Sequence, residues 1–103
     1  MSVLLEFAMF PTDKGISVSK DVSKIIAMIR DSGVSYKLTP MGTIIETDTM
    51  AKALEIIQKS YDLLADNSER IYSTLTFDIQ KGRNNRLISK VKSIEDKIGK
   101  VEK

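Results

Sequence analysis

Two glutamates, Glu6 and Glu46, each interrupt an apolar run that predicts a β-strand, residues 2–10 and residues 42–47 respectively. A carboxylate among apolar neighbours is costly to bury unless it accepts hydrogen bonds. Each glutamate therefore either receives donors from a bound ligand, or lies at a solvent-facing or subunit-interface position with an ordinary partner. Both interpretations stay open for Glu46, whereas we expect an ordinary partner for Glu6.

The composition excludes most other catalytic chemistry. The sequence contains no cysteine and no histidine, which removes thiol nucleophiles, disulfides, ordinary zinc sites and imidazole acid–base catalysis. Paired carboxylates can hydrolyse glycosides, but a domain of 103 residues leaves no room for a long substrate cleft. A glycine-rich phosphate loop is absent as well. We expect a binding protein that is not an enzyme.

The net charge of +2 hides an asymmetry along the chain. Residues 1–80 hold 8 basic and 11 acidic side chains, whereas residues 81–103 hold 8 basic and 3 acidic ones. A basic segment can indicate nucleic acid or an anionic membrane. Here acidic residues interrupt it, so we expect a solvated helix face.

Neither secretion nor membrane insertion is predicted. The N-terminal apolar segment lacks a basic region and contains Glu6, unlike a signal peptide. No apolar run approaches the ~20 residues that span a bilayer. The expected location is cytoplasmic, with no membrane partner.

The hydrophobic pattern predicts the order of the elements. A strand over 2–10 precedes a helix that ends near Gly33, and short strands over 34–39 and 42–47 flank a turn at Pro40-Met41. A second helix beginning after Asp48 or Thr49, a strand over 69–80 and a last helix through Val101 follow. This is a ferredoxin-like βαββαβ sandwich of the α+β class, with a four-stranded antiparallel sheet, an additional C-terminal helix and a single domain over 1–103.

One face of the predicted sheet is left uncovered, because right-handed crossovers place the first two helices on the other face. Alternation puts Gly42, Ile44 and Glu46 on one side of the third strand and Thr43, Ile45 and Thr47 on the other. The apolar residues assigned to the uncovered face would form a patch too large for a monomer: Leu4, Ala8, Phe10, Ile44 and Tyr72. We expect a symmetry mate to cover them and to create a pocket between subunits.

RNA-recognition domains share this topology and stack bases on aromatic side chains of the central strands. The third strand here has no basic-glycine-aromatic pattern and carries an acid in its middle. Phe7 and Phe10 lie three positions apart, an odd step along a strand, and so face opposite sides. We expect no nucleic-acid partner.

Nearly the whole chain resembles the single-domain members of the thiamine-binding protein family. The resemblance rests on Pro11 followed by Ser17-Val-Ser19, on the segment 32–46, on Glu69-Arg70 and on the segment 90–95, of which 32–46 is the most specific. It implies a homotetramer built as a dimer of dimers, and non-catalytic binding of thiamine (vitamin B1) or its hydroxymethylpyrimidine part, with no further cofactor. A structural or regulatory self-assembling protein without a small-molecule ligand is the alternative.

The resemblance also implies a ligand region, the hairpin and strand 40–46 with the loop 11–19 nearby. An aminopyrimidine presents an amine and ring nitrogens, which suit the Glu46 carboxylate and the hydroxyls of Thr43, Ser17 or Ser19. Tyr36, Met41 or Met9 is suited to pack on the ring. Other roles stay open: helix capping for Ser17 and Ser19, β-propensity on an exposed strand for Thr43, and a turn requirement for Gly42.

Overall fold

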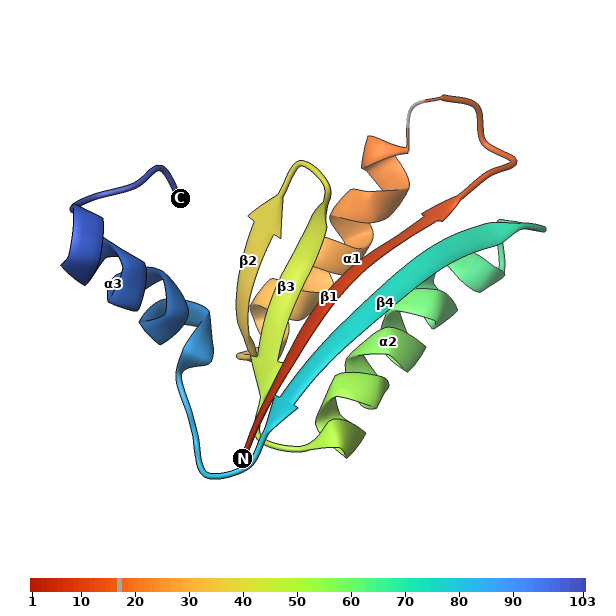
Figure 1. Ribbon diagram of the computed structural model, residues 1–103. Coiled ribbons are helices and arrows are strands. Elements are labelled where there is room, and N and C mark those ends of the chain that lie inside the picture. Colours follow the sequence, from red (N-terminus) through yellow and green to blue (C-terminus); the bar gives the residue numbers. More distant parts are fainter. Residues whose placement is uncertain (17) are drawn as a thin grey trace.

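The computed structural model describes residues 1–16 and 18–103. Its sheet has the strand order β2-β3-β1-β4 with every neighbouring pair antiparallel, and three helices accompany it (Figure 1). The predicted ferredoxin-like α+β fold with an additional C-terminal helix is therefore confirmed. In chain order the elements are β1 Ser2–Pro11, α1 Ser19–Ser32, β2 Ser35–Thr39, β3 Gly42–Thr47, α2 Met50–Ala65, β4 Ile71–Gln80 and α3 Arg86–Ile98.

Local chemistry explains where the helices begin and end. The Thr49 side chain accepts a hydrogen bond from the Lys52 backbone N–H at 3.1 Å and so caps the start of α2. Gly33 ends α1 in the left-handed region at φ 80°, which costs glycine little. α3 stops before Gly99, at φ 89°, so the prediction that Val101 continues this helix is wrong.

The core lies between one face of the sheet and the helices α1 and α2 (Figure 1). Alternate residues of β1 are at most 7% exposed, and Ile45 of β3 joins them from the neighbouring strand. The helices contribute residues three or four positions apart, as expected for one face of a helix. The core residues are Val3, Leu5, Phe7, Met9, Ile25, Ile29, Ile45, Ala53, Ile56 and Leu64.

The opposite face of the sheet, here called the open face, carries the intervening residues of β1. Leu4 pairs with Glu46 on β3 and with Asp78 on β4, and Glu6 pairs with Ile44. At the far end the rings of Phe10 and Tyr72 lie 5.8 Å apart. The predicted division of strand residues between two faces is confirmed.

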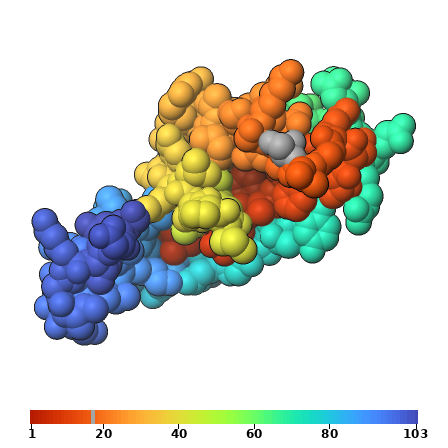
Figure 2. Space-filling model, turned by 90° about the horizontal axis from the view of Figure 1, so that it is seen from above, coloured from red at the N-terminus to blue at the C-terminus, as the bar shows by residue number. Residues whose placement is uncertain are grey.

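The last helix does not join α1 and α2. Figure 1 shows α3 on the other side of β2 from α1, and Figure 2 shows it projecting from one end of a molecule whose extents are 45 × 29 × 22 Å. Ile88, Ile94 and Ile98 on this helix are 69%, 52% and 72% exposed. Among the described residues, no helix has both the length and the apolar character needed to cross a membrane.

Candidate functional site

A small pocket, here called the hairpin pocket, lies between the β2–β3 hairpin, the end of β1 and the start of α1. Its volume is about 220 Å³. In Figure 2 the hairpin (yellow) and the start of α1 (orange) stand on either side of β1 (red). The lining is mainly apolar and includes the hydroxyl residues Thr39 and Thr43: Phe7, Ala8, Met9, Phe10, Val18, Val22, Ile25, Ile26, Leu38, Thr39, Pro40, Met41, Gly42 and Thr43.

The hairpin is shaped by a threonine and a glycine. Thr39 Oγ1 donates to the Gly42 carbonyl at 2.8 Å and accepts from the backbone N–H groups of Met41 and Gly42 at 3.3 and 3.2 Å. A Cβ at position 42 would lie 2.9 Å from the Phe7 carbonyl oxygen. The glycine is thus required by the close approach of β1 rather than by the turn alone, which had been the expectation. Met41 is 86% exposed at the rim.

Thr43 and Tyr36 both lie on the helix-covered side of the sheet. Thr43 pairs with Phe7 and is only 5% exposed, so its expected alternative role on an exposed strand is wrong. Tyr36 pairs with Ile45 and packs against the core. Because side chains alternate along a strand, neither side chain shares a face with Glu46.

The Glu46 carboxylate is occupied within the subunit. Its Oε2 accepts from Ser2 Oγ and from the Arg86 backbone N–H at 2.5 and 2.9 Å, and its Oε1 accepts from the Leu87 N–H at 3.1 Å. Burial alone would raise the pKa of Glu46, but these hydrogen bonds outweigh it and hold the pKa below its ordinary value. Glu46, on β3, therefore accepts hydrogen bonds from the first N–H groups of the helix α3, a role that the sequence did not reveal.

Arg86, which the sequence analysis did not single out, completes this network. It is 3% exposed and donates from Nε to Ser2 Oγ at 3.0 Å, and from Nη2 to the carbonyls of Ser2 and Asp78. Its Nη1 lies 3.0 Å from Asp78 Oδ1, and Lys90 Nζ lies 3.2 Å from Asp78 Oδ2. Hydrogen bonds from Arg86 and then Lys90 lower the pKa of Asp78. These contacts join α3 to β1 and β4.

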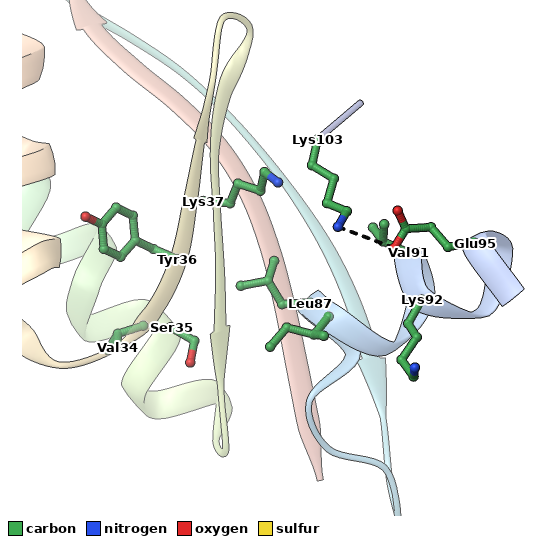
Figure 3. Close-up of a pocket in the computed structure, with 10 residues that line it drawn as sticks. Val34, Ser35, Tyr36, Lys37, Leu87, Val91, Lys92, Glu95 and Lys103 are labelled. Carbon is green, nitrogen blue, oxygen red and sulfur yellow. Dashed lines mark ion pairs between the residues drawn. The ribbon is translucent and has the colours of Figure 1, made fainter. Parts of the chain in front are cut away.

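A larger pocket, here called the α3 groove, separates β2 from α3 (Figure 3). Its volume is about 650 Å³. Figure 3 shows Lys37 pointing from β2 toward α3 and Lys103 pointing toward Glu95, whereas the Tyr36 side chain points away from α3. The lining residues are Val34, Ser35, Tyr36, Lys37, Leu87, Ile88, Val91, Lys92, Glu95 and Lys103.

The predicted site residues are thus only partly brought together. Met41, Gly42 and Thr43 meet at the hairpin pocket. Ser19 is exposed and does not cap α1, because Val18 holds the cap position without a side-chain hydrogen bond. Ser17 lies outside the described residues.

Comparisons with known proteins agree with the resemblance seen in the sequence. The model of the family described as thiamine-binding protein matches residues 5–95. A UPF0045 protein of Mycobacterium bovis is 30% identical over 95 residues, which is 92% of this chain and 93% of that protein. A UPF0045 protein of Methanocaldococcus jannaschii is 29% identical over 92 residues, which is 89% of this chain and 91% of that protein.

Solved structures share the fold. The crystal structure of the Methanocaldococcus jannaschii protein has a TM-score of 0.82 at 28% identity and covers 92% of this chain and 97% of its own. A Thermotoga maritima protein, assigned provisionally to thiamine biosynthesis or salvage, has a TM-score of 0.73 at 17% identity. The match covers 87% of this chain and 98% of that protein. At that identity the likeness concerns the fold alone. Because the family match extends over residues 5–95, the chain belongs to the thiamine-binding protein family.

Proposed function

We propose that this protein binds thiamine or its hydroxymethylpyrimidine part without chemical conversion, and that the hairpin pocket receives the pyrimidine ring. The observation that carries the proposal is the composition of this pocket, which combines apolar walls with the Thr43 hydroxyl in the segment most specific to the family. A hydroxyl both donates and accepts, and so matches the amine and ring nitrogens of an aminopyrimidine. Apolar side chains such as Phe7 and Met9 suit the ring faces.

The size of the pocket limits what enters it. Its volume of about 220 Å³ lies below the range of roughly 300–1,000 Å³ typical of pockets for drug-sized ligands. One six-membered ring fits such a space, so the thiazolium ring of thiamine would remain at the rim beside Met41. Hydroxymethylpyrimidine is therefore the minimal ligand.

Binding without catalysis agrees with the available side chains. The chain has no cysteine or histidine, and the carboxylate of Glu46 is engaged by α3 and Ser2. Glu6 lies on the open face, opposite the helix-covered face to which Thr43 belongs. Among the described residues, no group near the pyrimidine would thus have a catalytic task.

The proposal includes assembly into a homotetramer, built as a dimer of dimers. Ala8 and Phe10 line the hairpin pocket and also belong to the open face, so a subunit covering that face would help to close the pocket. Tyr72, next to Phe10, is 49% exposed in the single chain. Such exposed apolar area is what an oligomer of this fold would bury.

Isothermal titration calorimetry of the assembled protein with thiamine and with hydroxymethylpyrimidine tests the ligand. We expect both ligands to bind. Thr43→Val should lower the affinity for hydroxymethylpyrimidine by about tenfold or more, because a buried hydrogen-bonding partner is lost. Thr47→Val is the matched control, because Thr47 is buried on the same side of β3 but does not line the pocket, and it should leave binding unchanged. An absence of heat at millimolar ligand in the folded, assembled protein would refute the proposal.

The alternative is a structural or regulatory oligomer without a small-molecule ligand. The exposed isoleucines of α3 are the observation behind this alternative, because an exposed apolar surface fits a protein interface and needs no small-molecule ligand. A ligand that binds only the folded state must raise its stability. A tetramer whose Tm does not respond to thiamine or hydroxymethylpyrimidine would support this alternative.

A further inference from the structure

We propose that the α3 groove is a second ligand site, separate from the hairpin pocket, and that it takes an amphipathic anion: a phosphate ester or carboxylate carried on an apolar body. Its volume of about 650 Å³ lies within the range of roughly 300–1,000 Å³ typical of small-molecule pockets. No part of the thiamine-binding proposal depends on this groove.

The lining of the groove is divided between an apolar surface and positively charged side chains. The apolar surface comes from Val34, just before β2, and from three residues of α3: Leu87, Ile88 and Val91. Three lysines supply positive charge and a single glutamate opposes it: Lys37, Lys92, Lys103 and Glu95. A ligand with an apolar body and an anionic end matches both parts.

Glu95 does not neutralise all three lysines. Glu95 Oε1 lies 3.3 Å from Lys103 Nζ, and Glu95 Oε2 accepts from the Val101 N–H at 3.1 Å. Lys92 Nζ lies 3.9 Å from Asp96 Oδ1, and an exposed ion pair of this kind contributes little to stability. Lys37 has no ion pair or side-chain hydrogen bond among the described residues. Lys37 and Lys92 are therefore available for an anion.

The fold holds these groups in place from both sides. Lys37 pairs with Ile44, and so projects from the open side of β2 toward α3 (Figure 3). On the other wall, the contacts of Glu46 and Arg86 fix the first turn of α3 to β1 and β3. The separation of the two walls is thus set by a buried polar network rather than by the groove residues.

The same charges distinguish this groove from the hairpin pocket. Thiamine is a cation, which a cluster of lysines repels, whereas the hairpin pocket has no charged lining residue among those described. The two pockets also lie along different stretches of β2, residues 35–37 and residues 38–39. The difference in charge therefore matches the anion to the α3 groove and the thiamine-like ligand to the hairpin pocket.

The test is calorimetry of the assembled protein with 2-naphthyl phosphate and 2-naphthoate, against 2-naphthol and inorganic phosphate. We expect one or both naphthyl anions to bind far more tightly than either half-probe, with affinity falling as salt is raised. The two anions distinguish a phosphate from a carboxylate preference. Equal binding of 2-naphthol and the anions, or no heat with either anion at millimolar concentration, would overturn the proposal.

Charge-matched variants locate the site. We expect the double variant Lys37→Gln with Lys92→Gln to lower the affinity for the preferred anion by about tenfold or more, because charge-assisted contacts are lost. The control pairs Lys24→Gln with Lys97→Gln, two exposed lysines outside the groove, and should retain affinity. Equal losses in both double variants would show a diffuse charge effect and overturn the proposal. Thiamine binding in the first double variant, and naphthyl binding in Thr43→Val, report separately on the hairpin pocket.

Discussion

Glu46 links β3 to a helix that begins forty residues later in the chain. The first N–H groups of a helix have no partner within it. Here the Glu46 carboxylate on β3 accepts hydrogen bonds from two of them. The positive end of the helix dipole also favours a negative charge at this position. One side chain thus connects the stability of β3, a central strand of the sheet, to the placement of α3.

Glu46→Gln should destabilise the protein by about 1–3 kcal/mol at neutral pH, because an amide keeps one acceptor and directs its NH₂ at other donors. The folded-state pKa of Glu46 lies below its ordinary 4.5, so its stabilisation is present above that value and is lost as pH falls through the folded pKa. The difference in unfolding free energy between wild type and variant should therefore shrink in acid.

Glu69→Gln is the matched control, since it makes the same chemical change on an exposed carboxylate outside the strands and outside the open face. Urea unfolding followed by circular dichroism across a pH series measures both variants. The interpretation fails if the two variants lose equal stability, or if the Glu46→Gln difference stays constant from neutral to acidic pH.

The β2–β3 hairpin depends on a close approach between two backbones. Residue 42 begins β3 where the strand passes the Phe7 carbonyl, and only a residue without Cβ avoids a contact of 2.9 Å. The neighbouring Met41 projects into solvent and carries no such constraint. Adjacent positions of one hairpin therefore differ sharply in the side chains they tolerate.

Gly42→Ala should cost about 1–3 kcal/mol, because the added methyl group forces β3 away from β1. Met41→Ala, at an exposed rim position, should change stability by no more than about 0.5 kcal/mol. Chemical denaturation of the two variants gives the comparison. Equal stability of Gly42→Ala and the wild type would show that the strands separate at this point without cost.

At the scale of the whole molecule, the two faces of the sheet are unequally covered. α1 and α2 bury one face, whereas α3 stands beside β2 and leaves its own isoleucines exposed. A helix that presents an apolar stripe to solvent generally has a partner. The elongated single chain is thus suited to being one part of an assembly.

Ile94→Asp should reduce the mass of the assembled protein, because the exposed Ile94 of the single chain would lie at a subunit interface. Ser93→Asp introduces the same charge at the neighbouring exposed position and should leave the mass of the proposed tetramer unchanged. Size-exclusion chromatography with light scattering measures the mass, and circular dichroism checks folding. A monomeric wild type, or an unchanged mass for Ile94→Asp, would contradict this role of α3.

Much of the fold could be predicted because its signals are local. The alternation of β1 divides Leu4 and Leu5 between two faces, Gly33 ends a helix through its own φ, and Thr49 caps the next helix within three residues. The candidate site was less predictable. The side occupied by Thr43 follows from alternation, but its burial depends on how α1 and the hairpin pack over it.

The amino-acid sequence by itself determined the strand and helix order, the two faces of the sheet and the absence of thiol and imidazole chemistry, since each depends on residue type and short-range period. Only the tertiary structure decided that Glu46 binds the start of α3, that Arg86 is buried beside Ser2, and that α3 stands apart to form a lysine-lined groove. The physical reason is distance along the chain. A side chain does not select a partner forty residues away until the strand register and the turn before α3 have brought the two together.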